Sequence, residues 1–157
     1  MNYSNFGDYL QGPVLAIFFF FLLVVLGIFF LNLLTFHRAL LQVQPSNQLI
    51  APNNVWLMFI PLFSSIYAFI LYPKLSDSIR NEYQARGLKG DGDFGKNMGI
   101  AMAVLGLCGW IPVLGGLASL TNFVLFIIFW VKIGNYRTVL KSSPNQSVGS
   151  SREDLLD

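Results

Sequence analysis

The segment from Gly90 to Gly95 comes closest to a recognised chemical motif. Its three glycines, Gly90, Gly92 and Gly95, have the G-x-G-x-x-G spacing of a dinucleotide-binding loop, in which backbone amides hold a pyrophosphate. That loop requires a preceding strand and a βαβ unit, whereas the pattern here predicts an amphipathic helix before it and a membrane span after it. Asp91 and Asp93 begin a calcium-loop pattern that lacks its remaining ligands. We therefore interpret the segment as a turn between helices, with Asp93 capping the next helix, and expect no cofactor.

The other reactive side chains are few and scattered. His37 is the only histidine and Cys108 the only cysteine, so neither a multi-histidine metal site nor an intrachain disulfide can form. The His37-Arg38 pair is interpreted as a loop or headgroup contact, and no serine has the G-x-S-x-G setting of a nucleophile. All eight carboxylates lie outside the predicted spans, where they could not couple a proton or an ion inside a membrane. We expect that the chain is not an enzyme and that it binds no metal.

The composition is that of a membrane protein. Of the 157 residues, 54% are hydrophobic and 11% charged, and the mean hydropathy is +0.57, whereas about 25% of residues are charged in a soluble domain. The formal net charge of +2 is too small to indicate a nucleic-acid partner. The expected partner is the lipid bilayer.

Four apolar stretches predict an all-α, polytopic membrane domain over residues 1–136. The expected spans are residues 13–34, 55–72, 94–111 and 117–133, and the first has 22 uncharged residues, enough to cross a hydrocarbon core of about 30 Å. Pro61 lies inside the second span and predicts a kink. Residues 74–86 have the apolar spacing of a short amphipathic helix at the membrane surface. Residues 137–157 are expected to be a flexible cytoplasmic tail.

Interface residues and the charge distribution suggest an orientation. Trp56, Trp110 and Trp130 are expected to anchor span ends, together with the snorkelling amine of Lys132. The side with the N-terminus, the loop 74–96 and the tail would hold nine Lys and Arg residues, and the other side only Arg38. The positive-inside rule then places both termini in the cytoplasm and residues 37–54 outside. One local signal disagrees, because the first span has no Lys or Arg before it and has Arg38 just after it.

Small residues predict where the third and fourth spans pack. Gly95, Gly99 and Ala103 recur every four residues on one face, and small or polar residues form a comparable stripe across the next turn: Gly115, Ser119 and Asn122. Such faces let two helix backbones approach closely in lipid. We expect an antiparallel hairpin in which Asn122 hydrogen-bonds to a neighbouring helix. A subunit interface and a substrate contact are the alternatives at Asn122.

Two short runs resemble a known group of proteins. Val55-Trp56-Leu57 with Ile60-Pro61, and Trp130-Val131-Lys132-Ile133 with Tyr136, are similar to a family of uncharacterised bacterial four-span membrane domains. Some members of that family carry a GYF-like module ahead of this domain. The resemblance extends over roughly residues 33–136 and implies a location in the bacterial inner membrane, with no known activity or site.

These features favour a non-enzymatic accessory or scaffold subunit of a larger inner-membrane complex, with other membrane proteins as partners. The alternative from another class is an oligomeric channel or carrier that uses Pro61 and the glycine-rich third span as hinge and pore wall. A third possibility is a lipid-interaction or membrane-stress protein that acts through the amphipathic segment and the tail.

Overall fold

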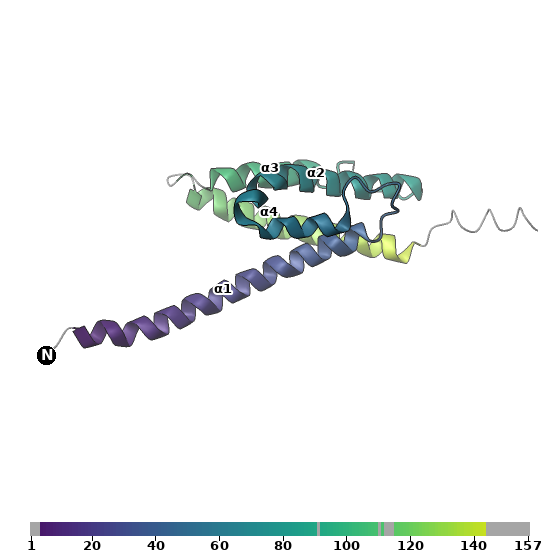
Figure 1. Ribbon diagram of the computed structural model, residues 1–157. Coiled ribbons are helices and arrows are strands. Elements are labelled where there is room, and N and C mark those ends of the chain that lie inside the picture. Colours follow the sequence, from purple (N-terminus) through teal and green to yellow (C-terminus); the bar gives the residue numbers. More distant parts are fainter. Residues whose placement is uncertain (1–3, 91, 110, 112–114, 144–157) are drawn as a thin grey trace, which may run out of the picture. The chain divides into compact units, whose positions relative to one another are not determined.

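The computed structural model describes residues 4–90, 92–109, 111 and 115–143, with side chains from residue 12 onward except residue 61. Within these residues it contains no strand, which confirms the all-α class (Figure 1). The five helices are α1 (Ser4–Leu40), the 3₁₀ helix η1 (Pro52–Phe59), α2 (Pro61–Ala85), α3 (Lys96–Cys108) and α4 (Gly115–Ser142).

Two segments in the described part of the chain are long and apolar enough to cross a membrane. They are Gly12–Leu40 within α1 and the whole of α4. At 13 residues, α3 is about 20 Å long, shorter than a hydrocarbon core of about 30 Å. The prediction of four spans is therefore not confirmed.

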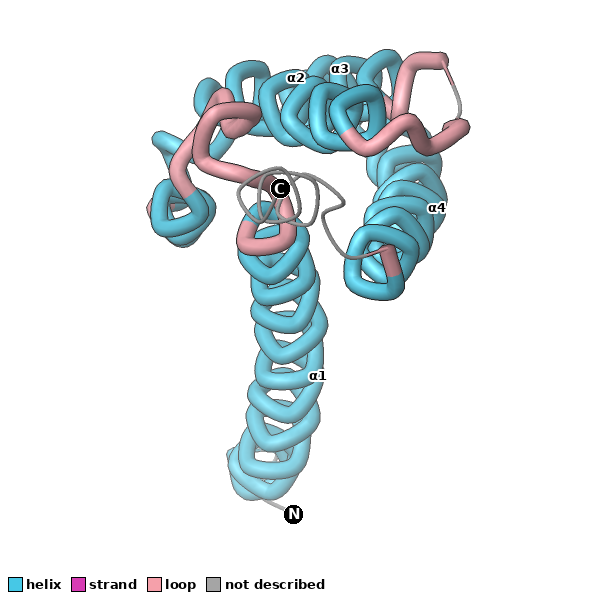
Figure 2. The backbone as a smooth tube through the Cα atoms, turned by 90° about the vertical axis from the view of Figure 1, so that its right-hand side faces the viewer, coloured by secondary structure: helices cyan, strands magenta, loops and turns pink. Residues whose placement is uncertain are grey.

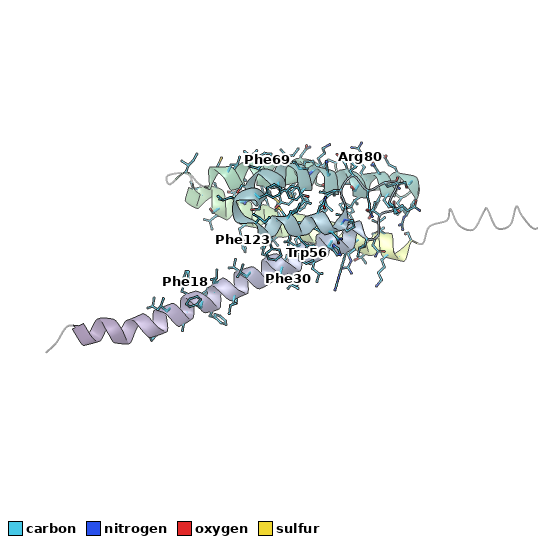
Figure 3. All side chains as sticks on the ribbon, in the orientation of Figure 1. Phe18, Phe30, Trp56, Phe69, Arg80 and Phe123 are labelled. Carbon is cyan, nitrogen blue, oxygen red and sulfur yellow. The ribbon has the colours of Figure 1, made fainter. Side chains whose placement is uncertain are left out.

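The chain divides into two units, Met1–Leu34 and Thr35–Asp157. The first is the greater part of α1, and large apolar side chains project from it on every side, among them Phe18 and Phe30 (Figure 3). Phe18 is 61% exposed and Leu23 68%. A helix that is apolar all round has no face suited to water, so this surface needs an apolar environment.

The stretch predicted as the second span, residues 55–72, is not one helix in the structure. Pro61 does not lie inside a helix: residues 52–59 form η1, and Pro61 is the first residue of α2. The first position of a helix suits proline, because the N–H group that proline lacks has no acceptor within the helix there. Pro73 is the proline inside α2, and the helix continues through it to Ala85. The segment predicted as a separate amphipathic helix, residues 74–86, is thus almost entirely the second half of α2.

In the Thr35–Asp157 unit, α2, α3 and α4 lie side by side, with α3 antiparallel to both neighbours (Figures 1 and 2). Three buried rings, here called the aromatic layer, join the end of α1 to α2 and α4. The ring centroids of Tyr72 and Phe129 are 5.4 Å apart, and that of Phe36 is 6.3 Å from Tyr72 and 5.6 Å from Phe129. Edge-to-face contacts of this kind add about 0.5–1.5 kcal/mol each to the burial of the rings.

A second aromatic group closes the bundle near the α2–α3 loop. Tyr83, Phe94 and Tyr136 have ring centroids 5.0–5.4 Å apart. The Tyr83 hydroxyl donates to the Tyr136 carbonyl oxygen at 3.3 Å, and burial raises the pKa of this phenol. Phe94 takes a positive φ of 51°, which positions its ring in this group. These contacts hold the loop against α2 and α4.

Candidate functional site

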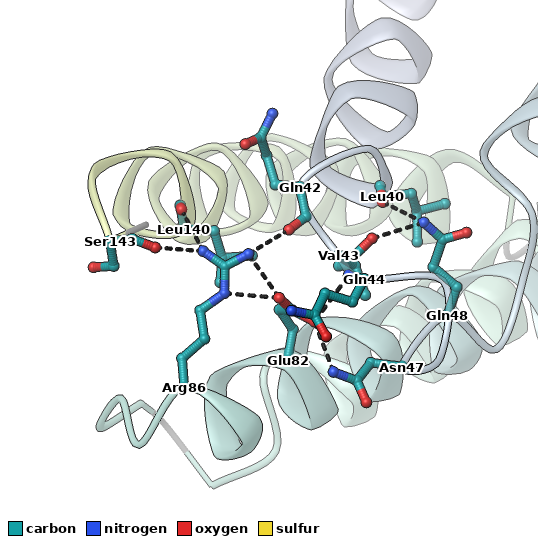
Figure 4. Close-up of polar contacts among 10 residues, drawn as sticks. All are labelled: Leu40, Gln42, Val43, Gln44, Asn47, Gln48, Glu82, Arg86, Leu140 and Ser143. Carbon is teal, nitrogen blue, oxygen red and sulfur yellow. Dashed lines mark hydrogen bonds and ion pairs between the residues drawn. The ribbon is translucent and has the colours of Figure 1, made fainter. Parts of the chain in front are cut away.

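A buried ion pair, here called the clamp, forms between Glu82 and Arg86 at the end of α2 (Figure 4). The Glu82 side chain is fully buried, and that of Arg86 is 11% exposed. Both the Nε and Nη2 groups of Arg86 donate to Oε1 of Glu82, at 2.7 and 2.6 Å. The spacing of four residues puts the two side chains on one face of the helix.

The other carboxylate oxygen of Glu82 is held by the loop that follows α1. The backbone N–H of Gln44 and the side-chain amide of Asn47 donate to Oε2 at 2.9 and 2.7 Å. Burial alone would raise the pKa of Glu82, but the hydrogen bonds from Asn47, Gln44 and Arg86 and the charge of Arg86 outweigh it and lower the pKa. Glu82 is therefore held as a carboxylate.

Arg86 also joins three segments of the chain through backbone carbonyls. Its Nη1 group donates to the oxygens of Leu140 and Ser143, at 2.7 and 2.5 Å, and Nη2 donates to the oxygen of Gln42 at 2.7 Å. Leu140 lies in the last turn of α4, where carbonyls lack partners within the helix, and Ser143 directly follows the helix. The clamp thus ties α2 and α4 to the loop after α1.

Amide and hydroxyl side chains secure the same loop at two more points. Gln48 Nε2 donates to the carbonyl oxygens of Leu40 and Val43, at 2.9 and 2.8 Å, and so caps the end of α1. Ser78 Oγ on α2 accepts from the backbone N–H of Leu49 at 2.9 Å. The loop is folded onto α2 along several residues.

The clamp corrects the predicted orientation of the loops. Residues 37–54 were expected outside the membrane, and residues 74–96 and the tail inside. Hydrogen bonds of less than 3 Å join Gln42 and Gln44 to the end of α2, and Arg86 in turn to the end of α4. Groups in direct contact cannot lie on opposite sides of a bilayer. The count of basic residues on each side assumed four complete crossings, which the structure does not confirm.

Charged side chains on the outside of the bundle form a looser set of contacts. Asp77 lies 2.7 Å from Lys96 and 3.9 Å from Arg80, and Lys132 lies 3.8 Å from Asp93. Asp93 also accepts from the N–H groups of Gly95 and Asn97 at 3.1 and 3.4 Å, although the N-cap position of α3 is Gly95 rather than Asp93. Their side chains are 22–42% exposed, and pairs that water reaches contribute about 0–1 kcal/mol each.

The small residues of α3 lie against α2 as well as α4. A Cβ at Gly99 would lie 2.6 Å from Cβ of Tyr72, and Ala103 is 3% exposed. Gly95 has a φ of +85° and precedes α3, and a Cβ there would lie 3.1 Å from the Phe129 ring. The closest approach at Gly99 is to α2, whereas the sequence suggested the fourth span.

The three residues of the second predicted stripe, Gly115, Ser119 and Asn122, have different environments. A Cβ at Gly115 would lie 2.8 Å from the carbonyl oxygen of Gly109 across the turn. Ser119 is exposed. Asn122 is half-buried, and its Oδ1 atom is buried with no hydrogen-bond partner among the described residues. No described residue of a neighbouring helix donates the expected hydrogen bond to this oxygen.

The predicted anchor Trp56 lies on η1 and packs against the end of α1. Its ring centroid is 5.8 Å from that of His37 and 5.9 Å from that of Phe59. His37 Nδ1 lies within hydrogen-bond distance, 3.0 Å, of the Pro52 carbonyl oxygen. These contacts give His37 a structural role, because they hold η1 alongside the end of α1.

Of the other predicted anchors, Trp130 Nε1 donates to Thr35 Oγ1 at 2.9 Å. Lys132 follows on the same helix with its side chain 25% exposed. Trp110 lies outside the described residues.

Sequence reasoning missed the clamp, because it placed Glu82 and Arg86 on the outer faces of a surface helix. Two signals were present. Glu82 precedes Arg86 by four residues, and the loop 41–51 after α1 has no charged residue but four amide side chains: Gln42, Gln44, Asn47 and Gln48. Among the residues that the structure describes, no group of three or more His, Cys, Asp or Glu side chains could hold a metal ion. No known family model matches the chain, and no curated protein or solved structure matches it.

Proposed function

We propose that this chain is an integral protein of the bacterial inner membrane and serves as a non-enzymatic accessory or scaffold subunit of a larger membrane complex. The main support for the proposal is a contrast within the bundle. One end is held together by the clamp, whereas the helices expose large apolar side chains elsewhere. On α4, Leu117 is 75% exposed, Leu120 69% and Phe123 56%. Lipid or another membrane subunit would cover such a surface at little cost.

The state of Glu82 supports a role in bracing rather than in catalysis. It is the fully buried carboxylate of the described chain, and both of its oxygens accept hydrogen bonds from the protein itself. A general acid or base needs a free position facing its substrate. The polar atoms of Glu82 and Arg86 instead make hydrogen bonds that join three segments of the chain.

The clamp also supports one orientation. If α1 crosses the bilayer, its N-terminal end lies opposite the loop after Leu40, and that loop shares a side with the end of α4. All ten Lys and Arg residues follow residue 37, so this arrangement puts none on the N-terminal side. The positive-inside rule then places the N-terminus outside and the charged end in the cytoplasm. The local signal around Arg38, which conflicted with the four-span count, agrees with this arrangement.

Cysteine labelling tests the orientation. Single cysteines at Ser4, Ser46 and Ser143 in a Cys108→Ser background would be treated with a membrane-impermeant maleimide in intact spheroplasts. We expect labelling at position 4 and protection at positions 46 and 143 until the membrane is opened. Different accessibility at positions 46 and 143 would contradict the clamp, and protection at all three positions would contradict the crossing by α1.

The accessory role is tested by the mass of the particle in mild detergent. We expect the 17.6 kDa chain to elute in a larger complex with a fixed ratio of at least one other membrane protein. Variants with Leu117→Ser and Leu120→Ser on the exposed face of α4 should release it, while Lys89→Ser in the α2–α3 loop should not. A chain that elutes alone, with its detergent belt, would rule out the accessory role.

An oligomeric channel or carrier is the second candidate, because two buried polar atoms lie in the uncharged part of the bundle. The Tyr67 hydroxyl and Asn122 Oδ1 have no hydrogen-bond partner among the described residues. Liposomes containing the purified chain would be tested for sodium, potassium and chloride flux with ion-selective dyes. Saturable flux in the parent that is lost in Asn122→Leu would favour this candidate. We expect instead that the flux of the parent equals the background of empty vesicles.

A further inference from the structure

The basic side chains from Arg38 to Lys141 gather at one end of the helical bundle. From Arg38 to Lys141 the chain contains nine Lys and Arg residues against four Asp and Glu residues, a formal charge of +5 compared with +2 for the whole chain. Residues 39–73 and 97–131 contain no charged residue. The remaining bundle surface is therefore uncharged, and the whole-chain net charge conceals a strongly basic end.

Three of these basic residues lie at one level, set by the aromatic layer. Each helix that contributes a ring to this layer has a basic residue two or three positions further along: Arg38 on α1, Lys74 on α2 and Lys132 on α4. The three segments run in the same direction, because all of them end at the clamp. At 1.5 Å per residue, the three residues lie about 3–5 Å beyond the rings.

The antiparallel helix α3 supplies a fourth basic residue at this level. Gly99 lies beside the aromatic layer, since a Cβ there would contact Tyr72 and Phe129. Lys96 precedes Gly99 by three residues and so lies on the same side of the layer as the other three. We call Arg38, Lys74, Lys96 and Lys132 the basic ring, with one member on each α-helix.

The basic ring marks the boundary between two kinds of surface. Arg38 and Lys74 are exposed, and the side chains of Lys96 and Lys132 are 37% and 25% exposed. Large apolar side chains are exposed on the uncharged side of the ring, including Ile70 at 44%, Ile100 at 37% and Val131 at 57%. Long basic side chains at such a boundary lay their stems along apolar surface and extend their charged ends to the polar phase.

We infer that the basic ring binds the phosphate groups of anionic phospholipids in the cytoplasmic leaflet, an inference that rests on the proposed membrane location. An anionic leaflet attracts basic residues held at its surface, and the effect adds for each Lys or Arg. Asp77 and Asp93 already engage Lys96 and Lys132. Arg38 and Lys74 are thus the ring members whose charge is most available to phosphate.

The test measures which lipid stays with the full chain. The protein is reconstituted into nanodiscs with equal amounts of phosphatidylglycerol and phosphatidylcholine, extracted in mild detergent, and examined by native mass spectrometry for bound lipid. We expect the parent to retain phosphatidylglycerol preferentially. The double variant Arg38→Gln/Lys74→Gln should lose that preference by about fivefold or more.

Two control variants distinguish lipid binding at the basic ring from a general effect of positive charge. Lys89→Gln/Lys141→Gln removes the same charge from exposed positions of the basic end outside the ring, and it should keep the preference. Arg38→Lys/Lys74→Arg conserves the charge and should also keep it. An equal loss in the Lys89/Lys141 variant would overturn the ring as the binding site.

The remaining outcomes distinguish this inference from the proposed function. Equal retention of both lipids by the parent would overturn the lipid inference alone, because the chain would still have entered the bilayer. A chain that does not enter these mixed nanodiscs would overturn the membrane location and the ring together.

Discussion

The two ends of the Thr35–Asp157 unit differ in how far their side chains find partners within the chain. At the charged end, a buried carboxylate and a guanidinium make their hydrogen bonds within the chain, and the loop after α1 supplies two of the donors to the carboxylate. At the uncharged end, the outer faces of α2 and α4 have large apolar side chains that are exposed among the described residues. The charged end is complete by itself, whereas the uncharged end depends on its surroundings.

This difference indicates where substitutions should change the fold and where they should change only associations. A buried ion pair is sensitive to the loss of one partner, because the charge left behind has neither water nor a counter-ion. An exposed apolar face contributes little to the isolated chain.

The largest effect is expected at Glu82. Glu82→Ala would leave Arg86 buried beside the now unpaired donors of Gln44 and Asn47, and breaking such a pair costs about 3–5 kcal/mol. The free energy of unfolding in mild detergent, followed by circular dichroism during titration with a denaturing detergent, measures the loss. Asp77→Ala removes a carboxylate from a partly exposed pair and should cost at most about 1 kcal/mol. Similar losses at the two positions would refute the contrast.

A smaller loss is expected where α3 approaches α2. Gly99→Leu places a side chain where even a Cβ would lie 2.6 Å from the Tyr72 Cβ, an atom fixed on its helix. Overpacking of this kind costs about 1–3 kcal/mol. Gly106→Leu on the same helix is the control, since a Cβ there meets nothing within 4 Å. If both variants unfold at the same detergent concentration as the parent, the close approach at Gly99 is wrong.

The pH dependence of stability should come from the clamp. Because the pKa of Glu82 lies below its ordinary value of 4.5, the folded protein holds the carboxylate ionised at pH values where the unfolded chain binds a proton. The stabilisation is complete above pH 4.5 and is lost as the pH falls through the folded-state pKa. The difference in thermal midpoint between the parent and Glu82→Gln should therefore narrow on acidification. A difference that stays constant down to pH 3 would show that ionised Glu82 contributes nothing to the clamp.

The sequence predicted the helical class and the apolar stretches, because composition and periodicity determine both. It did not predict the clamp, since Glu82 and Arg86 at a spacing of four residues are indistinguishable from a surface pair until the loop after α1 folds over them. The two prolines show a similar limit. Pro61 and Pro73 both lie in or next to an apolar stretch, and only the contacts of η1 determine that the first begins a helix while the second lies within one.

The smallest effect is expected at Asn122, where the sequence and the structure give different answers. A hydrogen bond between helices in lipid would make Asn122→Leu destabilising by about 0.6–2 kcal/mol. In the structure, however, the Oδ1 atom is buried without a partner among the described residues, and removing an unsatisfied acceptor is nearly neutral or stabilising. We expect the isolated chain to keep its stability or gain up to about 1 kcal/mol, measured by the same detergent titration with exposed Ser119→Leu as the control. A loss confined to the assembled complex would instead give Asn122 a partner on another subunit, and the uncharged end would then be completed by protein rather than by lipid alone.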